Sequence, residues 1–372
     1  METFLPKVKR VIGIGDIHSD LELIVSIFFA AKLINDDFEW IANPPDTIVV
    51  QVGDQIDGKR GEEKYLNKCG DIMTLLFFET MNIRAMRKGG KVISLIGNHE
   101  LMNVIGRFDY VADKDLYGFS FGNLKGEEGR RKAFVPGGPL AKLLSKRLSV
   151  VAIGSSLFVH AGILPEHLVL GLHRNPRECL EEFNKKVSDY LAGKMNNRLG
   201  SGQIPRFITD CDSPFWTRIY GGREEDSKLY GGSDGNNDNN DNNEKTKQNR
   251  SLTELIEEFF SEPINPRNPL NEEDNDFFYG GNDVPSTTCE KVEQTLDLLS
   301  LKYMIVGHTP QKDHKINNAC GGKLYRIDGG FSRAFYPPKE HENTIQYIEI
   351  LNDDKPIIRT AKRIGNVCFT NY

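Results

Sequence analysis

The chain has 372 residues, 38% of them hydrophobic, and its 53 acidic and 47 basic side chains give a formal net charge of −6. This length allows one large domain or two, with enough apolar residues for a substantial core. The acidic balance argues against a nucleic-acid-binding surface, so we expect no nucleic-acid partner. No run approaches the ~18 apolar residues of a membrane span, and the N-terminus METFLPKVKR lacks a signal-peptide apolar stretch. We therefore expect a soluble cytoplasmic protein with no membrane partner.

Predicted strands and helices alternate in the first part of the chain. In order, they are a strand in 7–16, a helix over 21–33, a strand over 47–52, a helix over 62–88 and a strand beginning at Lys91. The helix over 21–33 is apolar almost all round, which predicts that its neighbours cover it on every side. Gly89 and Gly90 end the second helix. Strands that alternate with helices of this length indicate βαβ units and a largely parallel sheet.

The later part of the chain contains further strand patterns. The apolar runs 156–162 and 303–309 are predicted strands. After them, KLYRID (323–328), TIQYIEIL (344–351) and PIIRTAKR (356–363) are predicted to form hairpins. We therefore expect the C-terminal part to be mostly antiparallel.

The cysteines are scattered and form no CxxC pair. They are Cys69, Cys179, Cys211, Cys289, Cys320 and Cys368. In a chain of this length, such spacing is typical of reduced thiols in a cytosolic protein, and we expect them to be reduced.

Residues 231–250 contain almost no apolar side chain and therefore cannot offset the entropy of ordering. We expect a disordered, asparagine-rich insertion on the surface, either passive or acting as an interaction loop. A predicted short helix over 251–260 and a proline-rich stretch over 261–274 follow it.

Polar side chains with metal-binding groups follow five of the apolar runs. They are Asp16, His18, Asp54, Asp57, Asn98, His99, His160 and His308. Open α/β sheets place their active sites at such strand ends, and glycines stand beside these residues, as expected where the backbone turns sharply. By itself, a histidine after a strand is usually structural and a Gly-Asp pair is usually a turn. Four of the chain's eight histidines share this setting, however, and the joint pattern favours a metal site.

Imidazole, carboxylate and amide ligands suit Mn, Fe or Zn and do not suit thiolate-bound metals. The ligands are too many for one tetrahedral site, whereas two ions about 3.5–4 Å apart that share a carboxylate use them all. Such a pair polarises a phosphoryl group and makes hydroxide from bridging water near neutral pH. We therefore expect two divalent metal ions, with Asp54 as the bridging ligand.

Five motifs occur in the order GDIHSD, GDQIDG, GNHE, HAG and GHT. This series resembles the calcineurin-like metallophosphoesterases, and GNHE is characteristic of their phosphoprotein phosphatase branch. The longer stretches GNHELMNVIGRFDYV, LFVHAGILPEH, DSPFWTR and CGGKLYRIDGGFSRAF are similar to those of the Shewanella-like protein phosphatases. The resemblance implies an α/β fold, the metallophosphatase-type sandwich of two mixed β-sheets flanked by helices. It also implies a single catalytic domain over residues 9–372.

The resemblance assigns roles to the motif residues. One metal ion is implied to be bound by Asp16, His18 and Asp54, and the second by Asp54, Asn98, His160 and His308. Pro310 stands where many metallophosphoesterases have a further histidine, so water is expected to complete the first ion's ligand shell. His99 is implied to be the general acid that protonates the leaving alkoxide, with Asp57 accepting its other ring hydrogen.

The chain departs from the family pattern at one position. Protein phosphatases usually have a phosphate-gripping arginine where this chain has Gly58. Arg218 in DSPFWTR matches the family's other phosphate-binding arginine, and Arg60 and Arg107 are candidates for the missing one. Two arginines matter because paired guanidinium hydrogen bonds orient the phosphoryl group and also neutralise its charge.

Together these residues predict a dinuclear-metal phosphoprotein phosphatase that hydrolyses phosphomonoesters by direct attack of a metal-bridging hydroxide. The expected partner is a phosphoprotein or phosphopeptide substrate carrying phosphoserine or phosphothreonine, with phosphotyrosine also open. Two alternatives are a hydrolase of dinucleoside polyphosphates and a catalytically impaired binding protein with the phosphatase fold.

Overall fold

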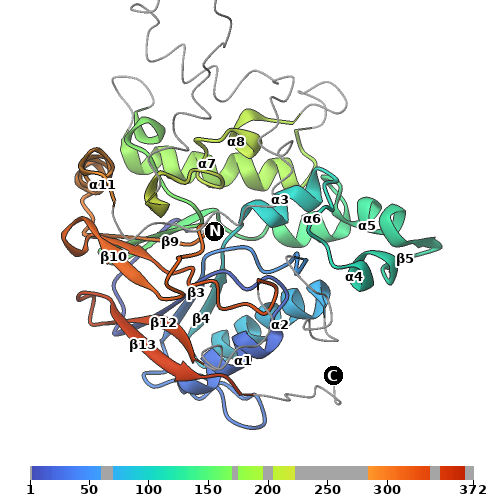
Figure 1. The fold of residues 1–372 in the computed structure, drawn as a ribbon, viewed down its shortest axis with the longest axis horizontal. Coiled ribbons are helices and arrows are strands. Elements are labelled where there is room, and N and C mark those ends of the chain that lie inside the picture. Colours follow the sequence, from blue (N-terminus) through green and yellow to red (C-terminus); the bar gives the residue numbers. More distant parts are fainter. Residues whose placement is uncertain are drawn as a thin grey trace, which may run out of the picture.

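The computed structural model describes residues 2–59, 70–169, 175–195, 204–222, 284–335 and 344–364. Two mixed β-sheets face each other, and helices cover the outer face of each sheet (Figure 1). The predicted sandwich of two mixed sheets is therefore confirmed. The predicted insertion 231–250, the helix over 251–260, the proline-rich stretch 261–274 and Arg60 all lie outside the described residues.

The first sheet has five strands in the order β13-β12-β2-β3-β4. Their bounds are β2 (Arg10–Ile14), β3 (Ile48–Gln51), β4 (Lys91–Ser94), β12 (Thr344–Leu351) and β13 (Ile357–Lys362). Strands β2, β3 and β4 are parallel and are connected through α1 (Leu21–Ala30) and α2 (Asp71–Met86), which confirms the predicted βαβ units. Strand β12 is antiparallel to both β2 and β13.

Local signals account for the ends of the first two helices. Asp20 accepts a hydrogen bond from the N–H of Leu23, so its carboxylate caps the first turn of α1. Helix α1 ends at Ala30, three residues before the predicted end, and Lys32 beyond it has a φ of +51°. The described part of the second helix starts at Asp71, and Gly89 follows its end with a φ of +93°, as the glycine pair predicts.

The second sheet has six strands in the order β1-β7-β8-β9-β11-β10. Their bounds are β1 (Phe4–Leu5), β7 (Val150–Ile153), β8 (Ser156–Val159), β9 (Tyr303–Val306), β10 (Asn317–Ala319) and β11 (Leu324–Arg326). The strand β7 was not predicted. It forms an antiparallel pair with β8, and only two residues, Gly154 and Ser155, separate the two strands, so the sequence shows no clear boundary between them.

The predicted pairing of KLYRID is wrong in part. This segment contains β11, which pairs antiparallel with β10 but parallel with β9, and which lies in the other sheet from β12 and β13. The antiparallel hairpin is confirmed only for β12 and β13 within the predicted set of three. A strand of three residues has too few side chains for its sequence to indicate which strand it pairs with. Its pairing is decided by the packing of the whole sheet, in which the edge of β9 accepts it.

Alternate side chains of each central strand enter different parts of the core. On β3, Val50 packs between the two sheets, whereas Val49 packs against α1 and α2. On β8, Phe158 packs between the sheets, whereas Leu157 and Val159 face the helices of the opposite layer. Both faces of these strands are covered, which explains why they are continuous apolar runs in the sequence.

Most of the remaining elements lie on the outer side of the six-stranded sheet, away from the five-stranded sheet (Figure 1). They are α3 (Asn98–Val104), α4 (Asp113–Tyr117), β5 (Ser120–Phe121), β6 (Leu124–Lys125), α5 (Gly126–Phe134), α6 (Pro139–Leu144), α7 (Pro176–Leu191), α8 (Arg206–Thr209) and α11 (Ser286–Leu299), with 3-10 turns at Pro165–Leu168, Ile219–Gly221 and Cys320–Gly322. None of the helices within the described ranges is long and apolar enough to cross a membrane.

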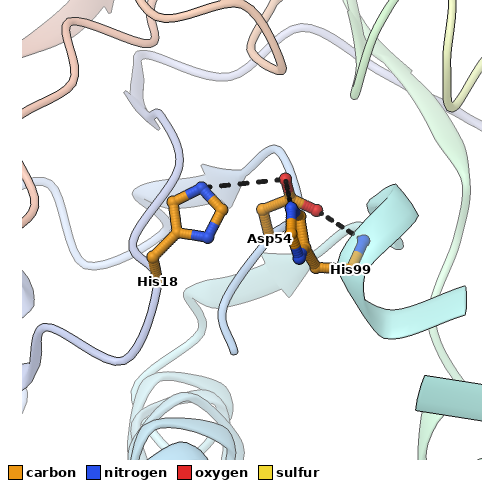
Figure 2. Close-up of side chains that lie close together, drawn as sticks. All are labelled: His18, Asp54 and His99. Atoms are coloured by element: carbon orange, nitrogen blue, oxygen red, sulfur yellow. Dashed lines mark hydrogen bonds and ion pairs between the residues drawn. The ribbon is translucent and has the colours of Figure 1, made fainter. Parts of the chain in front are cut away.

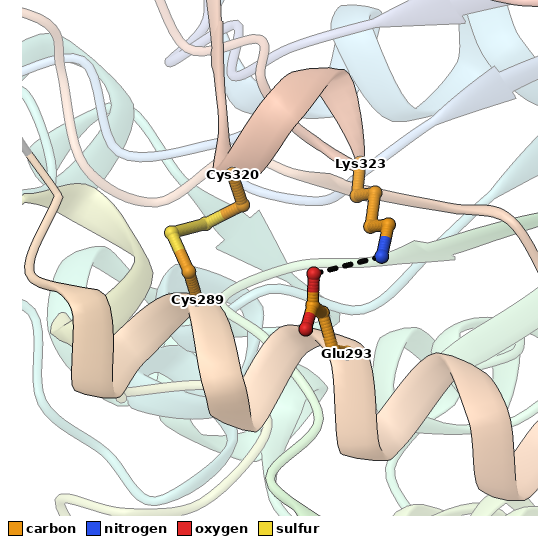
Figure 3. The surroundings of a disulfide bond; sticks show 4 residues. All are labelled: Cys289, Glu293, Cys320 and Lys323. Carbon is orange, nitrogen blue, oxygen red and sulfur yellow. Dashed lines mark hydrogen bonds and ion pairs between the residues drawn. A yellow bond between two sulfur atoms is a disulfide. The ribbon is translucent and has the colours of Figure 1, made fainter.

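A disulfide joins Cys289 near the start of α11 to Cys320 in the 3-10 turn (Figure 3). The prediction of reduced thiols is therefore wrong for these two residues, which are brought together by the packing of α11 against the turn. One helical turn further along α11, Glu293 pairs with Lys323 at 2.8 Å across the same contact. That ion pair is exposed and adds little stability, so the disulfide is the stronger of these two links between the segments.

Replacing both cysteines with serine should lower the free energy of unfolding by about 2–4 kcal/mol, because a cross-link that closes a loop of this size restricts the unfolded chain. Urea denaturation followed by circular dichroism measures the change. The matched control is Cys211→Ser, which alters a free thiol and leaves the cross-link intact. An unchanged unfolding midpoint in the double variant would contradict the stabilising role.

Candidate metal centre

Strand ends from both sheets converge on one buried position. The five-stranded sheet contributes residues that follow β2, β3 and β4, and the six-stranded sheet contributes residues that follow β8 and β9. Two groups of ligand atoms result, each with all atoms within 4.8 Å of one another: His18, Asp54 and His99, and Asp54, His160 and His308. Asp54 belongs to both groups. Figure 2 shows the first of them, with the rings of His18 and His99 both next to the Asp54 carboxylate.

Asp54 is held by its backbone in an unusual conformation. Its φ is +54°, a value that non-glycine residues rarely adopt and that tends to occur at functional sites. The carboxylate of Glu100 accepts the N–H groups of Asp54, Gln55 and Gly97 at 2.8–2.9 Å. A Cβ atom on Gly97 would lie 2.2 Å from Oδ1 of Asp54, so only glycine lets the two loops approach this closely.

Backbone carbonyls orient the rings of three histidines. Nδ1 of His18 lies 3.2 Å from the carbonyl oxygen of Ile56, and Nδ1 of His160 lies 3.0 Å from that of Val52. Nε2 of His308 lies 3.1 Å from the carbonyl oxygen of Trp216. A carbonyl only accepts hydrogen bonds, so the contacted nitrogen carries the proton and the other nitrogen is left as a metal ligand.

The free nitrogens of two histidines face an amide oxygen. Oδ1 of Asn98 lies 2.8 Å from Nε2 of His160 and 3.0 Å from Nδ1 of His308. With the tautomers described above, three acceptor atoms meet there without a proton between them, an arrangement that a bound cation stabilises. The donor set of neutral imidazole, carboxylate and amide oxygen therefore fits a divalent ion.

Asp16 supplies a further acceptor but belongs to neither of the two groups. Its Oδ2 accepts the N–H of His308 at 3.0 Å, while its buried Oδ1 has no hydrogen-bond partner among the described residues. Burial raises the pKa of Asp16 well above its usual value, and the negative charges of Asp328 and Asp54 raise it further. A cation beside this oxygen would reverse that effect, because it favours the ionised form.

The electrostatic surroundings keep two of the histidines neutral. Burial lowers the pKa of His160 to about 3, and the positive charge of Arg218 acts in the same direction. Burial and the same guanidinium lower the pKa of His308 well below its usual value. Neutral imidazole is the form that binds metals. The guanidinium of Arg218 is therefore near enough to lower the pKa of both rings.

His99 and Asp57 form a separate pair next to the cluster. Nδ1 of His99 lies 2.9 Å from Oδ2 of Asp57, and Nε2 lies 3.8 Å from Oδ2 of Asp54 (Figure 2). Asp57 is fully buried and has a φ of +69°. His99 thus has one nitrogen bound to a carboxylate and the other directed toward the space beside Asp54.

Of the other two arginines predicted to bind substrate, Arg60 lies outside the described residues and Arg107 pairs with a nearby acid. Nε of Arg107 pairs with Asp109 at 2.8 Å, and its side chain is partly exposed. Gly58, where the family has an arginine, is buried. Lys59 beyond it pairs with Asp113 at 2.9 Å, and its N–H bonds to the carbonyl of Tyr110.

Comparison with known proteins agrees with this geometry. The family model of calcineurin-like phosphoesterases matches residues 9–197. The chain belongs to the calcineurin-like phosphoesterase family. Enzymes of this family are phosphoesterases that use divalent metal ions, which fits the two ligand groups around Asp54.

Individual relatives extend the comparison over most of the chain. An uncharacterized protein of Acanthamoeba polyphaga mimivirus is 32% identical over 308 residues, which cover 78% of this chain and 100% of the relative. Shewanella-like protein phosphatase 2 of Arabidopsis thaliana is 27% identical over 90% of this chain and 74% of the relative. A crystal structure of the cold-active protein tyrosine phosphatase of a psychrophilic Shewanella has a TM-score of 0.57 at 15% identity, covering 97% of this chain and 83% of that one. This last likeness shows the shared fold.

Several buried polar residues around the site were not predicted. Glu100 is part of the GNHE motif, but no role was inferred for it, although its spacing two residues after Asn98 offered a signal. Asn103, Asp71 and Arg130 are fully buried behind Asp57 and His99. No local feature of the sequence distinguishes them from surface polar residues.

Asp54→Asn should abolish binding of both metal ions while leaving the fold intact, because it removes the charge that both ligand groups share. Metal analysis of the purified protein, with circular dichroism for the fold, measures the outcome. The matched control is Asp109→Asn, which makes the same chemical change at an exposed position. Two ions per chain in the Asp54 variant would show that Asp54 does not bridge them.

Proposed function

We propose that the protein is a phosphoprotein phosphatase with a dinuclear metal centre, formed by a single catalytic domain over residues 9–372. The observation that carries this proposal is the position of Asp54, whose carboxylate belongs to two separate groups of ligand atoms. In the proposed assignment Asp16 takes the place of His99 in the first group, so that one ion is bound by Asp16, His18 and Asp54. The other ion is bound by Asp54, Asn98, His160 and His308. The ions are manganese, iron or zinc, because the ligands are imidazole, carboxylate and amide groups.

The substrate phosphate would bind against the cluster and Arg218. Bound divalent ions supply Lewis-acid polarisation of the phosphoryl group and a water of lowered pKa near neutral pH. Arg218 adds a planar guanidinium that orients and neutralises the phosphate. Its electrostatic effect on His160 and His308 supports this role. Arg60 and Arg107 are the proposed alternatives for the second phosphate-binding arginine.

His99 is the proposed general acid. Its Nδ1 is hydrogen-bonded to Asp57, so the ring orientation is defined, and Nε2 lies on the side of the metal site, 3.8 Å from Oδ2 of Asp54. In the proposed step, His99 gives the proton on Nε2 to the oxygen of the leaving alcohol as its bond to phosphorus breaks. Asp57 stabilises the charged ring before this transfer.

The names of the relatives support protein substrates. The Arabidopsis relative is a Shewanella-like protein phosphatase, and the Shewanella structure is a protein tyrosine phosphatase. We therefore propose phosphoserine, phosphothreonine and phosphotyrosine side chains as the substrate class. The alternative activity, cleavage of dinucleoside polyphosphates, uses the same metal chemistry on a phosphoanhydride and is an outcome of the following test.

The protein supplied with Mn, Fe or Zn should hydrolyse phosphopeptides in preference to dinucleoside polyphosphates. Release of inorganic phosphate from peptides carrying each of the three phosphorylated residues, compared with nucleotide release from diadenosine tetraphosphate, measures the preference. The Asp54→Asn variant is the control for contaminating phosphatase. If only the dinucleotide is hydrolysed, dinucleoside polyphosphates replace phosphopeptides as the proposed substrate class. If neither substrate nor an aryl phosphate is hydrolysed, the result favours a non-catalytic binding protein.

His99→Asn should lower kcat on phosphoserine peptides by about 10²–10⁴ with normal metal content, because in the proposed assignment His99 donates a proton and binds neither metal ion. The loss should be smaller for nitrophenyl phosphate, since that leaving group departs without a proton. Steady-state kinetics on both substrates, with metal analysis of the same preparation, measures the difference. Equal losses on both substrates would argue against general-acid catalysis by His99.

A further inference from the structure

Arg130, on α5, is fully buried, although the charged side chains of Glu128 and Arg131 on the same helix are exposed. Its guanidinium carbon lies 4.9–5.9 Å from the ring centroids of Phe108, Phe119 and Phe134. Its Nη1 is buried and has no hydrogen-bond partner among the described residues. Burying a charge in such surroundings is costly, and an apolar side chain of similar volume is often at least as stabilising. The burial of an arginine here therefore indicates a role beyond stability.

The hydrogen bonds of Arg130 lead to the carboxylate that holds the general acid. Nε of Arg130 donates to Oδ1 of Asn103 at 2.7 Å, and Nδ2 of Asn103 donates to Oδ1 of Asp57 at 2.8 Å. Nη2 of Arg130 lies 3.7 Å from the same Asp57 oxygen. The other oxygen of Asp57, Oδ2, contacts His99. Oδ1 of Asp57 is thus bound by Asn103, with Arg130 nearby, while Oδ2 is bound to the ring of His99.

Asp71 connects the same arginine to the backbone of Asp57. Nη2 of Arg130 donates to Oδ2 of Asp71, and Oδ1 of Asp71 accepts the N–H of Asp57 at 3.1 Å. The second contact supports the left-handed backbone of Asp57. Asp71 is fully buried, as are Asn103, Asp57 and Arg130. The group therefore restrains both the side chain and the main chain of Asp57 in a dry environment.

We propose that Arg130 is a positioning residue for the general acid. With Asn103 and Asp71 it fixes Asp57, and Asp57 fixes the ring of His99 with Nε2 directed at the leaving group. Arg130 is buried behind Asp57 and acts through His99 without touching the substrate. This inference rests on the proposed phosphatase activity, but its structural part, the hydrogen bond between Asp57 and His99, can be measured without turnover.

The test compares variants that differ in the charge they leave buried. Arg130→Met alone leaves Asp71 unpaired and is expected to be less stable, so the main variant is Arg130→Met combined with Asp71→Asn, which removes both charges of the pair. Arg130→Lys retains the positive charge but lacks the planar guanidinium with its several N–H donors, so its kcat should lie between those of the wild type and the double variant. The matched control is Arg131→Met, at the next position, where the side chain is half exposed and pairs with Glu127.

The Arg130/Asp71 double variant should lose roughly 10–100-fold in kcat on a phosphoserine peptide, as is typical when a supporting contact behind a functional group is removed. KM and bound metal should stay unchanged, and the loss should be smaller on nitrophenyl phosphate. In the His99→Asn background the same substitutions should have no further effect, because their effect passes through the ring. The Arg131 control should match the wild type. A loss that persists at full size in the His99→Asn background, or no loss at all, would overturn the proposal.

A proton NMR measurement separates this inference from the phosphatase activity. The proton on Nδ1 of His99 should give a resonance downfield of the amide region, identified by its absence in His99→Asn. The resonance should disappear or shift in the Arg130/Asp71 double variant and remain in Arg131→Met. If the wild-type protein hydrolyses no phosphomonoester, the proposed function fails while this resonance still decides the positioning role. An unchanged resonance in the double variant would overturn that role.

Discussion

Acceptor atoms that converge on one buried point are the constraint on which the rest of the structure depends. A carboxylate, an amide oxygen and unprotonated ring nitrogens meet there, contributed by Asp54, Asn98, His18, His160 and His308, and Asp16 lies beside them. Such groups repel one another unless a cation or a proton lies between them. A fold that brings them together must hold them rigidly, which the left-handed backbone of Asp54 and the three amides bound by Glu100 accomplish.

The sandwich supplies this rigidity because the ligands come from both of its sheets. Asp54 follows a strand of the five-stranded sheet, whereas His160 and His308 follow strands of the six-stranded sheet. The distance between these ligands is therefore determined by the packing of the sheets, in which Val50 and Phe158 are fully buried in one core. Close-packed interiors deform little, so the ligand positions are insensitive to movements of the surface loops.

Most of the fold, and the convergence of candidate ligands on Asp54, could be predicted from local patterns in the sequence. Apolar runs that stop at a glycine and a ligand-type side chain identify the strand ends, and the carboxyl ends of parallel strands meet at one edge of a sheet. The Asp57–His99 pair was anticipated only from family resemblance and is formed by residues 42 positions apart. Contacts at such separation leave no periodic signal in the sequence.

Features that depend on tertiary packing were not predictable. Arg130 and Arg131 are adjacent and identical in type, yet one is fully buried and the other is half exposed. Cys289 and Cys320 stand in unrelated local contexts, and only the packing of α11 against the turn brings them together. The neighbour of β11 depends on which strand position is open in the sheet, so a three-residue segment could not reveal it.

The place of β12 in the first sheet affects how this sheet forms while the protein is being synthesised. Strand β2, which leads to Asp16 and His18, pairs with β3 on one side and with β12 on the other. Its first neighbour, β3, is synthesised early, whereas β12 is synthesised only after all the strands of the six-stranded sheet. Until then one edge of β2 has unpaired backbone groups, which in a nascent protein invite pairing with other chains. The segment that carries Asp16 and His18 is therefore enclosed late, when β12 pairs with β2.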